Sequence, residues 1–436
     1  MKNDAAVRAT GVRWRVLVLI MAAGLVSYLL RGNLSIAAPA MMADLHLSEL
    51  QWGWVMSAFP LGYALFQFPG GLYGERVGPR RAIAHIAIAW GLLVAVTALV
   101  PGPATVPAFV TLGALVLVQF LVGAAHAPVF PVIAATIERW FPVGAWGLPN
   151  GLTSTGLTVG LAATASLLPW LIGSLGWRES FLVLAPTGLA MGAAWWWYVR
   201  DRAAEHPAIA PAELALIRGT RVEHDRRPPR PGTKPAWLHI VRDGNVLRLT
   251  ASYACMNFVF YLVFSWGYYY LVTVRGYGEQ QAGFLTSLQW LGAGAGAALG
   301  GWACDRQCRR LGLRWGCRWT VLVGMTAQAV LLIGVAYWPD PGVAAAMLGL
   351  CFFFNQTCEG SYWNTVTAVG GRHAGPASGV MNTGANLMGF VNALLLSMLA
   401  QWLGWPTAVA FGAVFALAGA ALMLTVRADE QMDQSA

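Results

Sequence analysis

The sequence predicts an all-α membrane protein with twelve transmembrane helices in two pseudo-symmetric six-helix bundles. Its composition, its apolar segments and its basic residues all favour this fold. Of the 436 residues, 57% are hydrophobic and only 11% are charged, whereas about 25% of the residues in a typical soluble domain are charged. Apolar segments of about 20 residues, long enough to cross a hydrocarbon core about 30 Å thick, recur along the whole chain.

Twelve segments have the length and composition of membrane spans. In lipid they must be helical, because every backbone polar group then needs a partner within the protein. The first span is too long, and carries an arginine too deep within it, to be a cleaved signal peptide. The predicted spans are 14–38, 50–72, 81–100, 106–135, 146–172, 178–199, 246–274, 281–303, 318–338, 343–368, 376–401 and 405–426.

The basic residues predict the orientation. With the N-terminus in the cytoplasm, Arg178 and Arg275 are the only lysines or arginines on the opposite side, which satisfies the positive-inside rule. The net charge of +9 then reflects membrane topology and not nucleic-acid binding. We expect a multi-pass protein of a bacterial inner membrane that contacts lipid, has both termini in the cytoplasm and is a monomer.

One long polar segment divides the chain. Residues 200–245 are rich in arginine and proline and cannot span a membrane. We therefore expect an N-terminal bundle (1–199), a cytoplasmic linker (200–245) and a C-terminal bundle with a short cytoplasmic tail (246–436). Within the linker, Pro211–Arg218 and 237–242 are predicted to be short helices, and the second of them is amphipathic.

The two halves contain related loop sequences. GGLYGERVGPRRA follows the second span and GGWACDRQCRRLG follows the eighth. Such internal symmetry predicts two bundles that rock around a central site. We expect the acids Glu75 and Asp305 to cap neighbouring helix N-termini, and the arginines to hold the loops at anionic headgroups. We interpret these residues as a gate, although the loops could also be topology signals only: Glu75, Arg76, Arg80, Asp305 and Arg306.

Arg31 is the most informative single residue. It lies deep in the first span, with no acidic residue nearby in the sequence. A guanidinium at that depth costs about 2.5–3.5 kcal/mol, so it normally faces a polar cavity and has a partner. Its planar fork of donors matches a carboxylate, which favours a substrate anion as the partner. The alternative is a structural pairing with backbone carbonyls or a distant glutamate.

Several of these stretches resemble a known family. GGLYGERVGPRR resembles the loop signature of the major facilitator superfamily, with Glu75 where Asp is usual. SYLLRGNLSIAAPAM, GWVMSAFPLGYALFQFPGG, EHPAIAPAEL and SGVMNTGANLMG resemble its anion:cation symporter branch, which includes bacterial sugar-acid transporters and sialin-like vesicular carriers. The resemblance covers nearly the whole chain. It implies a transporter with the twelve-helix fold.

The resemblance also implies a substrate site. The substrate-binding arginine of the branch corresponds to Arg31, its second-helix tyrosine to Tyr63, and its tenth-helix aromatic residue to Trp363. Its eleventh-helix asparagine corresponds to Asn386, with Asn382 one turn earlier. These groups suit a carboxylate together with hydroxyls or an aromatic ring. Further polar residues could complete the site: Tyr28, Gln356, Asn257, Tyr261, Tyr268 and Asn355.

The sequence departs from the branch where coupling protons are expected to bind. Leu30 replaces the acid before the arginine, and in QFLVGAAHAPVFP Gln119 and His126 replace an arginine and a glutamate. His126 is a candidate proton carrier, because its unperturbed pKa is about 6.5, or else a neutral hydrogen-bond donor. Glu359 is a carboxylate buried in the tenth span, and is a candidate proton site, partner of Arg31 or gate.

Neither a cofactor nor a metal is expected. The sequence has no phosphate-binding loop and no nucleophile elbow, so we do not expect an enzyme. The spacing of Cys304, Cys308 and Cys317 matches no common zinc pattern, and we interpret them as incidental reduced thiols. Copper ligation by Cys255, Met256, Cys351 and Cys358 with His126 is disfavoured, because Met and Cys are ordinary packing residues in membrane spans.

The sequence therefore predicts a secondary transporter that imports a small organic anion by alternating access, with the proton as coupling ion. A sugar acid, an aromatic acid and a short carboxylate are the candidate substrates. The alternatives are a proton-antiport efflux carrier, a facilitative uniporter and a transport-dead sensor. The fifth-helix stretch GLTSTGLTVGLAATASLLPWL lacks the Gly-Pro element usual in exporters of the superfamily, which disfavours efflux.

Overall fold

The computed structural model describes residues 10–142, 147–218, 240–371 and 374–430. Every regular element in these residues is a helix. The first half contains one helical segment for each of its predicted spans, with the fourth span divided in two. These helices are α1 (Val12–Asp44), α2 (Glu49–Val77), α3 (Pro79–Ala98), α4 (Ala108–His126), α5 (Val129–Trp140), α6 (Gly147–Leu175) and α7 (Trp177–Tyr198).

The second half begins with a helix of changing winding. The helix α10 (Gly244–Tyr261) continues through the π-helical segment η2 (Leu262–Trp266), the short α11 (Gly267–Tyr269) and a second π-helical segment, η3 (Tyr270–Val274). π-Helical segments are rare and often occur at functional sites. The remaining helices are α12 (Glu279–Tyr337), α13 (Pro341–Gly370), α14 (Ala374–Leu403) and α15 (Trp405–Thr425).

The helix α12 contains two predicted spans. Its backbone turns at Gly312, where φ is 77° and ψ is 165°, a conformation that glycine adopts without steric cost. With α12 counted once, nine of the described helices are apolar and long enough to cross a membrane, and α2 and α7 have 29 and 22 residues. With the two arms of α12 counted separately, the described residues therefore contain the twelve predicted spans, and the predicted fold is confirmed.

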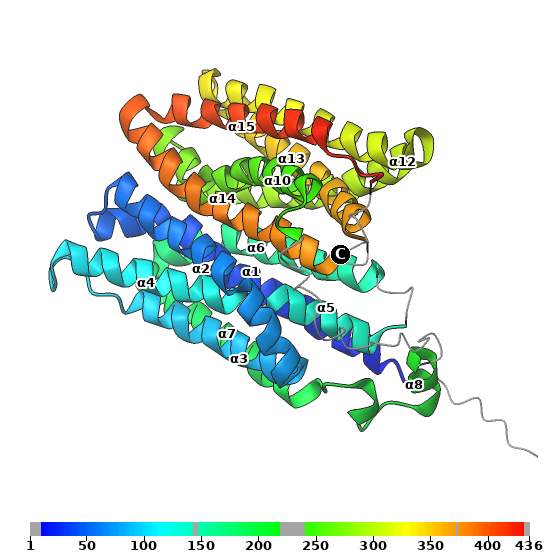
Figure 1. The fold of residues 1–436 in the computed structure, drawn as a ribbon. Helices are drawn as coiled ribbons and strands as arrows, with labels where there is room; N and C mark the ends of the chain where they lie inside the picture. The colour runs from blue at the N-terminus through cyan, green and yellow to red at the C-terminus, as the bar shows by residue number, and fades with distance from the viewer. Residues whose placement is uncertain (1–9, 143–146, 219–239, 372–373, 431–436) are drawn as a thin grey trace, which may run out of the picture.

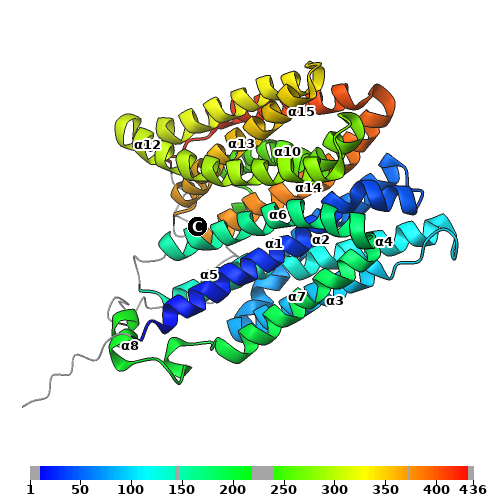
Figure 2. The ribbon, with the colours of Figure 1, turned by 180° about the vertical axis from the view of Figure 1, so that it is seen from behind.

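The two halves form separate groups of helices that meet along two helix pairs. Figures 1 and 2 show α1–α7, coloured blue to blue-green, on one side and α10–α15, coloured green to red, on the other. The helix α2 packs against α14, and α6 packs against α12. Any site at the centre of the molecule is therefore built from both halves. The proposed domain boundaries remain a prediction, although α7 ends and α10 begins close to them.

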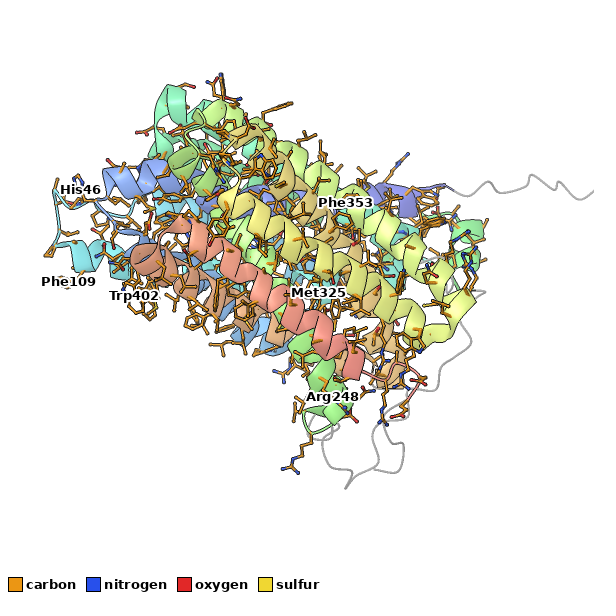
Figure 3. All side chains as sticks on the ribbon, turned by 90° about the horizontal axis from the view of Figure 1, so that it is seen from above. His46, Phe109, Arg248, Met325, Phe353 and Trp402 are labelled. Carbon is orange, nitrogen blue, oxygen red and sulfur yellow. The ribbon has the colours of Figure 1, made fainter. Side chains whose placement is uncertain are left out.

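The ends of the molecule differ in charge. We call the end where α1 begins and α15 finishes the termini end, and the opposite end the far end. The termini end contains Arg13, Arg80 and Arg427. Arg178 and Arg275 lie at the far end. Figure 3 shows the far end by the labelled residues His46, Phe109 and Trp402. The segregation of arginines that the sequence predicted is thus present in the structure.

The linker is attached to the first half at the termini end. Its predicted first helix is confirmed as α8 (Pro211–Arg218), whereas the first half of the predicted second helix, 237–242, lies outside the described residues. The buried Glu213 carboxylate accepts hydrogen bonds from Thr10 Oγ1 at 2.7 Å, Val12 N at 3.2 Å and Arg13 N at 3.1 Å. It therefore satisfies amide groups that the first turn of α1 leaves without helical partners.

The environment of Glu213 shifts its ionisation. Burial alone would raise its pKa, but the hydrogen bonds from Thr10, Arg13 and Val12 and the charge of Arg13 outweigh burial and lower the pKa below its ordinary value. A carboxylate with a lowered folded-state pKa stabilises the fold above its unfolded-state pKa. That stability is lost as the pH falls through the folded-state pKa.

We expect Glu213→Gln to destabilise the protein at neutral pH by about 1–3 kcal/mol, because buried amide donors lose a charged acceptor. The difference in apparent melting temperature from the wild type should shrink as the pH falls below about 4.3, the ordinary pKa of glutamate. Thermal unfolding in detergent measures both effects. Glu430→Gln, in an exposed pair with Arg427, is the matched control and should change little. A pH-independent difference for Glu213→Gln would contradict the assigned role of its charge.

Candidate functional site

Arg31 lies between the two halves. Its Nη1 donates a hydrogen bond to Tyr28 Oη at 3.2 Å, one turn earlier on α1, and its Nη2 donates to Tyr261 Oη of α10 at 3.3 Å. Its Nε is buried without a hydrogen-bond partner. Arg31 also forms no ion pair within the described part of the chain. The charge of Arg31 is therefore solvated by phenols and is not neutralised by an acid.

Aromatic rings from both halves surround this guanidinium. Arg31 Cζ lies 5.1 Å from the ring centroid of Tyr28, 4.7 Å from that of Phe59 and 5.8 Å from that of Tyr63. Phe264, in η2 of the second half, contributes a fourth ring at 5.1 Å. Each such cation–π contact contributes about 0.5–2 kcal/mol. A ring face stabilises the cation but leaves the N–H donors in the guanidinium plane available to an anion.

A chain of hydrogen bonds extends from Arg31 into the second half. Tyr261 Oη accepts from Arg31 and donates to Asn386 Oδ1 at 2.8 Å, and Asn386 Nδ2 donates to the backbone oxygen of Asn382 at 2.8 Å. The structure thus places Arg31, Tyr28, Tyr63 and Asn386 of the predicted set around one point. Asn382 contributes its backbone carbonyl.

The other predicted residues of α13 form a separate group. Glu359 Oε1 accepts hydrogen bonds from Tyr253 Oη at 2.8 Å and from Trp363 Nε1 at 2.6 Å. Tyr253 precedes Tyr261 on α10 by about two turns, or roughly 12 Å, towards the termini end. Of the roles considered for Glu359, a direct pairing with Arg31 is absent from the structure.

Gln356 is engaged elsewhere on α13. Its Nε2 donates to Asn355 Oδ1 at 3.1 Å. The Asn355 side chain in turn donates to Gln328 Oε1 at 3.0 Å and to the Met256 carbonyl at 3.1 Å. Gln356 therefore belongs to a polar network between α10, α12 and α13 and does not contact Arg31.

Sequence reasoning missed two rings of the site and underrated a third. Phe59 lies four residues before Tyr63 on α2, so the two share a helix face, and this spacing could have revealed it. Phe264 lies in a π-helical segment, whose altered winding an ordinary helical period does not predict. Tyr261 was expected only as one of several polar residues near a cavity.

His126 lies behind Phe59, at the last residue of α4. Its Nδ1 is 2.8 Å from the Val122 oxygen and its Nε2 is 3.2 Å from the Ser27 oxygen. The ring stacks on Trp90 at 4.7 Å and meets Phe59 edge-on at 5.4 Å. A neutral imidazole donates only one hydrogen bond, whereas the protonated ring can donate to both carbonyls. Phe59 also contacts Arg31, so it links the two basic groups.

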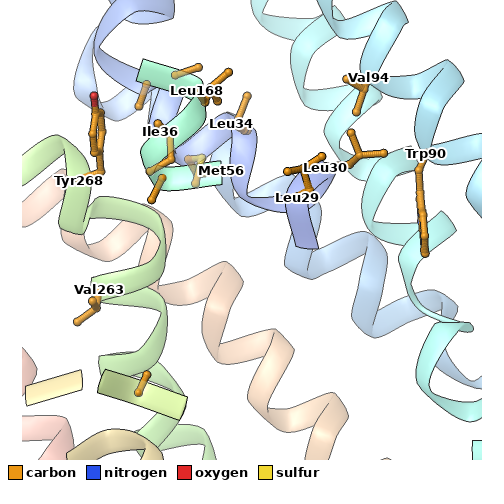
Figure 4. Packing of buried hydrophobic residues seen from close by; sticks show 14 of the residues in the cluster. Leu29, Leu30, Leu34, Ile36, Met56, Trp90, Val94, Leu168, Val263 and Tyr268 are labelled. Carbon is orange, nitrogen blue, oxygen red and sulfur yellow. The ribbon is translucent and has the colours of Figure 1, made fainter. Parts of the chain in front are cut away.

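Leu30 occupies an apolar environment. It is 1% exposed and belongs to the hydrophobic core, and Figure 4 shows it directed towards Trp90 and Val94 of α3. The position where the related branch has an acid is thus filled by packing between α1 and α3. It contributes no titratable group to the site.

The two halves are in close contact at the far end. Glu49 Oε1, on α2, accepts hydrogen bonds from Tyr269 Oη at 2.9 Å and Trp405 Nε1 at 2.8 Å, both in the second half. Ser166 of α6 and Ser287 of α12 are 2.6 Å apart through their hydroxyls. These contacts close the site towards the far end.

The same four helices have open space beside some of their glycines nearer the termini end. Near the far end, a Cβ atom placed on Gly53 of α2 would lie 2.9 Å from the backbone oxygen of Ala393 on α14. Nearer the termini, α2, α14, α6 and α12 each have a glycine at which a Cβ atom would meet nothing within 4 Å: Gly71, Gly379, Gly151 and Gly301. These four positions are therefore not points of close packing between the halves.

The predicted gate residues lie at the termini end. The Arg80 side chain donates to the Trp196 oxygen at 2.9 Å, and its backbone N donates to Asp201 Oδ1 at 2.9 Å. The Asp201 carboxylate therefore caps the N-terminus of α3. Arg306 stacks over Trp302 at 5.6 Å. In the described residues the other three gate candidates are exposed and form no hydrogen bond or ion pair, so the expected capping by the two acids is not seen: Glu75, Arg76 and Asp305.

Comparison with known proteins decides the family, because a model of the Major Facilitator Superfamily matches residues 20–393. The chain belongs to this superfamily. It is 27% identical to the hexuronate transporter of Bacillus subtilis, covering 93% of this chain and 90% of the relative. It is 28% identical to the D-galactonate transporter of Escherichia coli O6:H1, covering 94% of each. These relatives confirm the predicted kinship with sugar-acid transporters.

Solved structures of superfamily members have the same fold. A bacterial homologue of the human lysosomal transporter Spinster, in an inward-facing and unoccupied conformation, matches with a TM-score of 0.77 at 16% identity, covering 95% of this chain and 97% of that one. A D-xylose–proton symporter matches with a TM-score of 0.74 at 13% identity, covering 95% and 97%. The chain is thus a multi-pass integral membrane protein of a transporter superfamily and not an enzyme.

In this superfamily member, close backbone contact between α2 and α4 positions both Phe59 and His126. A Cβ atom at Gly123 of α4 would lie 2.0 Å from the Phe59 oxygen. We expect Gly123→Ala to destabilise the fold by about 1–3 kcal/mol through overpacking. Gly113→Ala, on the same helix with nothing within 4 Å, is the matched control and should be neutral or stabilising by up to about 1 kcal/mol. Melting temperatures in detergent compare the two, and equal values would contradict the close contact.

Proposed function

We propose that the chain imports a small organic anion across a bacterial inner membrane by alternating access. The observation that carries the proposal is the Arg31 guanidinium, which lies between the halves and has no acidic partner among the described residues. A sugar acid, an aromatic acid or a short carboxylate would supply the missing negative charge. The hexuronate and D-galactonate transporters among its relatives support this substrate class.

The surrounding groups suggest how such an anion binds. A carboxylate accepts two parallel hydrogen bonds from a guanidinium, an arrangement stronger and more directional than a neutral hydrogen bond. Tyr28, Tyr63 and Asn386 are then the candidate partners for substrate hydroxyls or a ring. Because Arg31 and Tyr261 belong to different halves, an anion bound at this point contacts both bundles. Binding can therefore favour one relative position of the halves over another.

The arginine distribution supports an orientation with both termini in the cytoplasm. In that orientation we infer an inward-facing state, closed at the far end by the contacts of Glu49 with Tyr269 and Trp405. Import then requires these contacts to open towards the outside while the termini end closes. We assign the closing of the termini end to the two repeated loops, through Glu75, Arg76, Arg80, Asp305 and Arg306.

Proton coupling through His126 and Glu359 is the second part of the proposal. His126 supports it because two carbonyl oxygens face its ring nitrogens, and Glu359 because it is a carboxylate within a span, on the termini side of the site. Facilitative uniport is the second candidate. The apolar environment of Leu30 favours it, since no acid remains at that position of the first span.

We expect Arg31→Ala to reduce uptake of labelled hexuronate or galactonate into proteoliposomes by about 100-fold, because loss of a buried charged partner costs about 2–5 kcal/mol. Arg31→Lys should also be impaired, since an ammonium lacks the bidentate fork. Arg248→Ala, which removes an exposed arginine of α10, is the control. A thermal shift with the substrate should disappear in Arg31→Ala. Uptake by Arg31→Ala at the wild-type rate would contradict the proposed site.

If protons are coupled, collapsing the pH gradient should abolish accumulation above the external concentration. We expect His126→Gln or Glu359→Gln to retain substrate exchange while losing accumulation driven by the gradient. Exchange and accumulation assays on the same vesicles separate the two functions, and Glu430→Gln serves as the control. Wild-type uptake that is unchanged without a gradient would establish uniport or another coupling ion, and would remove the proton roles of both residues.

A further inference from the structure

We propose that Cys304, Cys308 and Cys317 form a binding site for a thiophilic d10 cation, zinc(II) or copper(I). Their sulfurs form a nearly equilateral triangle, with Sγ–Sγ distances of 3.9 Å (Cys304–Cys308), 3.7 Å (Cys304–Cys317) and 3.7 Å (Cys308–Cys317). Within the described ranges, this is the only group of three or more His, Cys, Asp or Glu residues whose ligand atoms converge in this way.

The spacing of these three cysteines in the sequence matched no metal-binding pattern, and it is the fold that brings them together. Cys304 and Cys308 lie one turn apart on the first arm of α12, and the turn at Gly312 brings the second arm back beside them. Gly316 permits the closest approach, because a Cβ atom there would lie 2.7 Å from Cys308 Sγ and 2.4 Å from Cys308 N. Cys317, the next residue, then faces the two thiols of the first arm.

The triangle has the dimensions that a thiolate-bound metal requires. A point in its plane at equal distance from the three sulfurs lies about 2.2 Å from each, and a shift of about 0.7 Å out of the plane gives the zinc–sulfur distance of about 2.3 Å. Soft thiolate ligands select copper(I) and zinc(II). Binding displaces thiol protons to solvent and requires no oxidant.

Polar groups of α13 complete the surroundings. Asn364 Nδ2 lies 3.8 Å from both Cys304 Sγ and Cys317 Sγ, so the amide can donate to sulfur as groups around metal-bound thiolates do. The buried hydroxyl of Ser361, one turn earlier beside Cys304, has no geometrically satisfactory hydrogen-bond partner. It can donate a further hydrogen bond to the Cys304 sulfur, and water can take the open fourth position of a zinc ion. Buried thiols that serve only for packing need neither group.

The site lies at one of the repeated loops. Cys304 and Cys308 flank Asp305 and Arg306, whereas the first copy of the loop has Gly74 and Gly78 at the corresponding positions. The thiols are therefore not part of the repeat itself. Cys308 is only half-buried, which leaves a route for an ion from the termini end. A bound cation would join the two arms of α12 and fix this loop.

The test uses the full-length chain, purified under reducing conditions and stripped with a chelator. Zinc(II) and, without oxygen, copper(I) are each titrated against a chromophoric competitor. We expect one equivalent to bind, and Cys304→Ser and Cys317→Ser each to weaken binding at least tenfold. Cys351→Ser changes a buried cysteine outside the cluster and should bind like the wild type. Metal should also raise the melting temperature of the wild type and of Cys351→Ser but not of the cluster variants.

A second measurement covers the case in which the serine variants do not fold. Alkylation of Cys308 in the wild type, followed by peptide mass spectrometry, should slow at least tenfold when either metal is bound. Equal metal binding by Cys351→Ser and the cluster variants would overturn the proposal. Failure of the wild type to bind either ion would also overturn it. The same holds if the cluster forms a disulfide and metal does not slow the alkylation of Cys308.

Discussion

The central constraint on this molecule is a positive charge held between two helical bundles, where the described residues provide no negative partner. Arg31 is held by two phenols and by rings from both halves, which stabilise the cation without neutralising it. Keeping such a charge in a membrane protein is costly. The cost explains why aromatic side chains from α1, α2 and η2 gather at one point, and why an anion is the natural complement of this site.

The sequence was sufficient for the fold because the membrane leaves few alternatives. Apolar length and the exclusion of unpaired backbone groups predict each span, and even α8 was predicted at its observed bounds. Arg31 could be predicted for the same reason, since a lone charge is conspicuous in an apolar segment. The family resemblance then supplied Tyr63 and Asn386, which the structure places near it.

The contacts that could not be predicted from the sequence depend on how the helices wind and cross. Phe264 reaches Arg31 from a π-helical segment, and the triangle of Cys304, Cys308 and Cys317 exists only because α12 turns back at Gly312. Trp363 and Gln356 of α13 were predicted to join the site around Arg31, but hydrogen bonds to Glu359 and Asn355 hold them elsewhere. The sequence identifies the polar residues within the spans but not the hydrogen-bond partner of each.

The contacts of Glu49 at the far end have a thermodynamic consequence. Tyr269 and Trp405 both donate to the same oxygen atom, Oε1, so a single carboxylate fastens two separate helices of the opposite bundle. When that carboxylate withdraws from the opposite bundle, both hydrogen bonds are lost together. Such a shared acceptor makes unlatching cooperative. It favours two discrete states of the far end, closed and open, over a continuum of half-open ones.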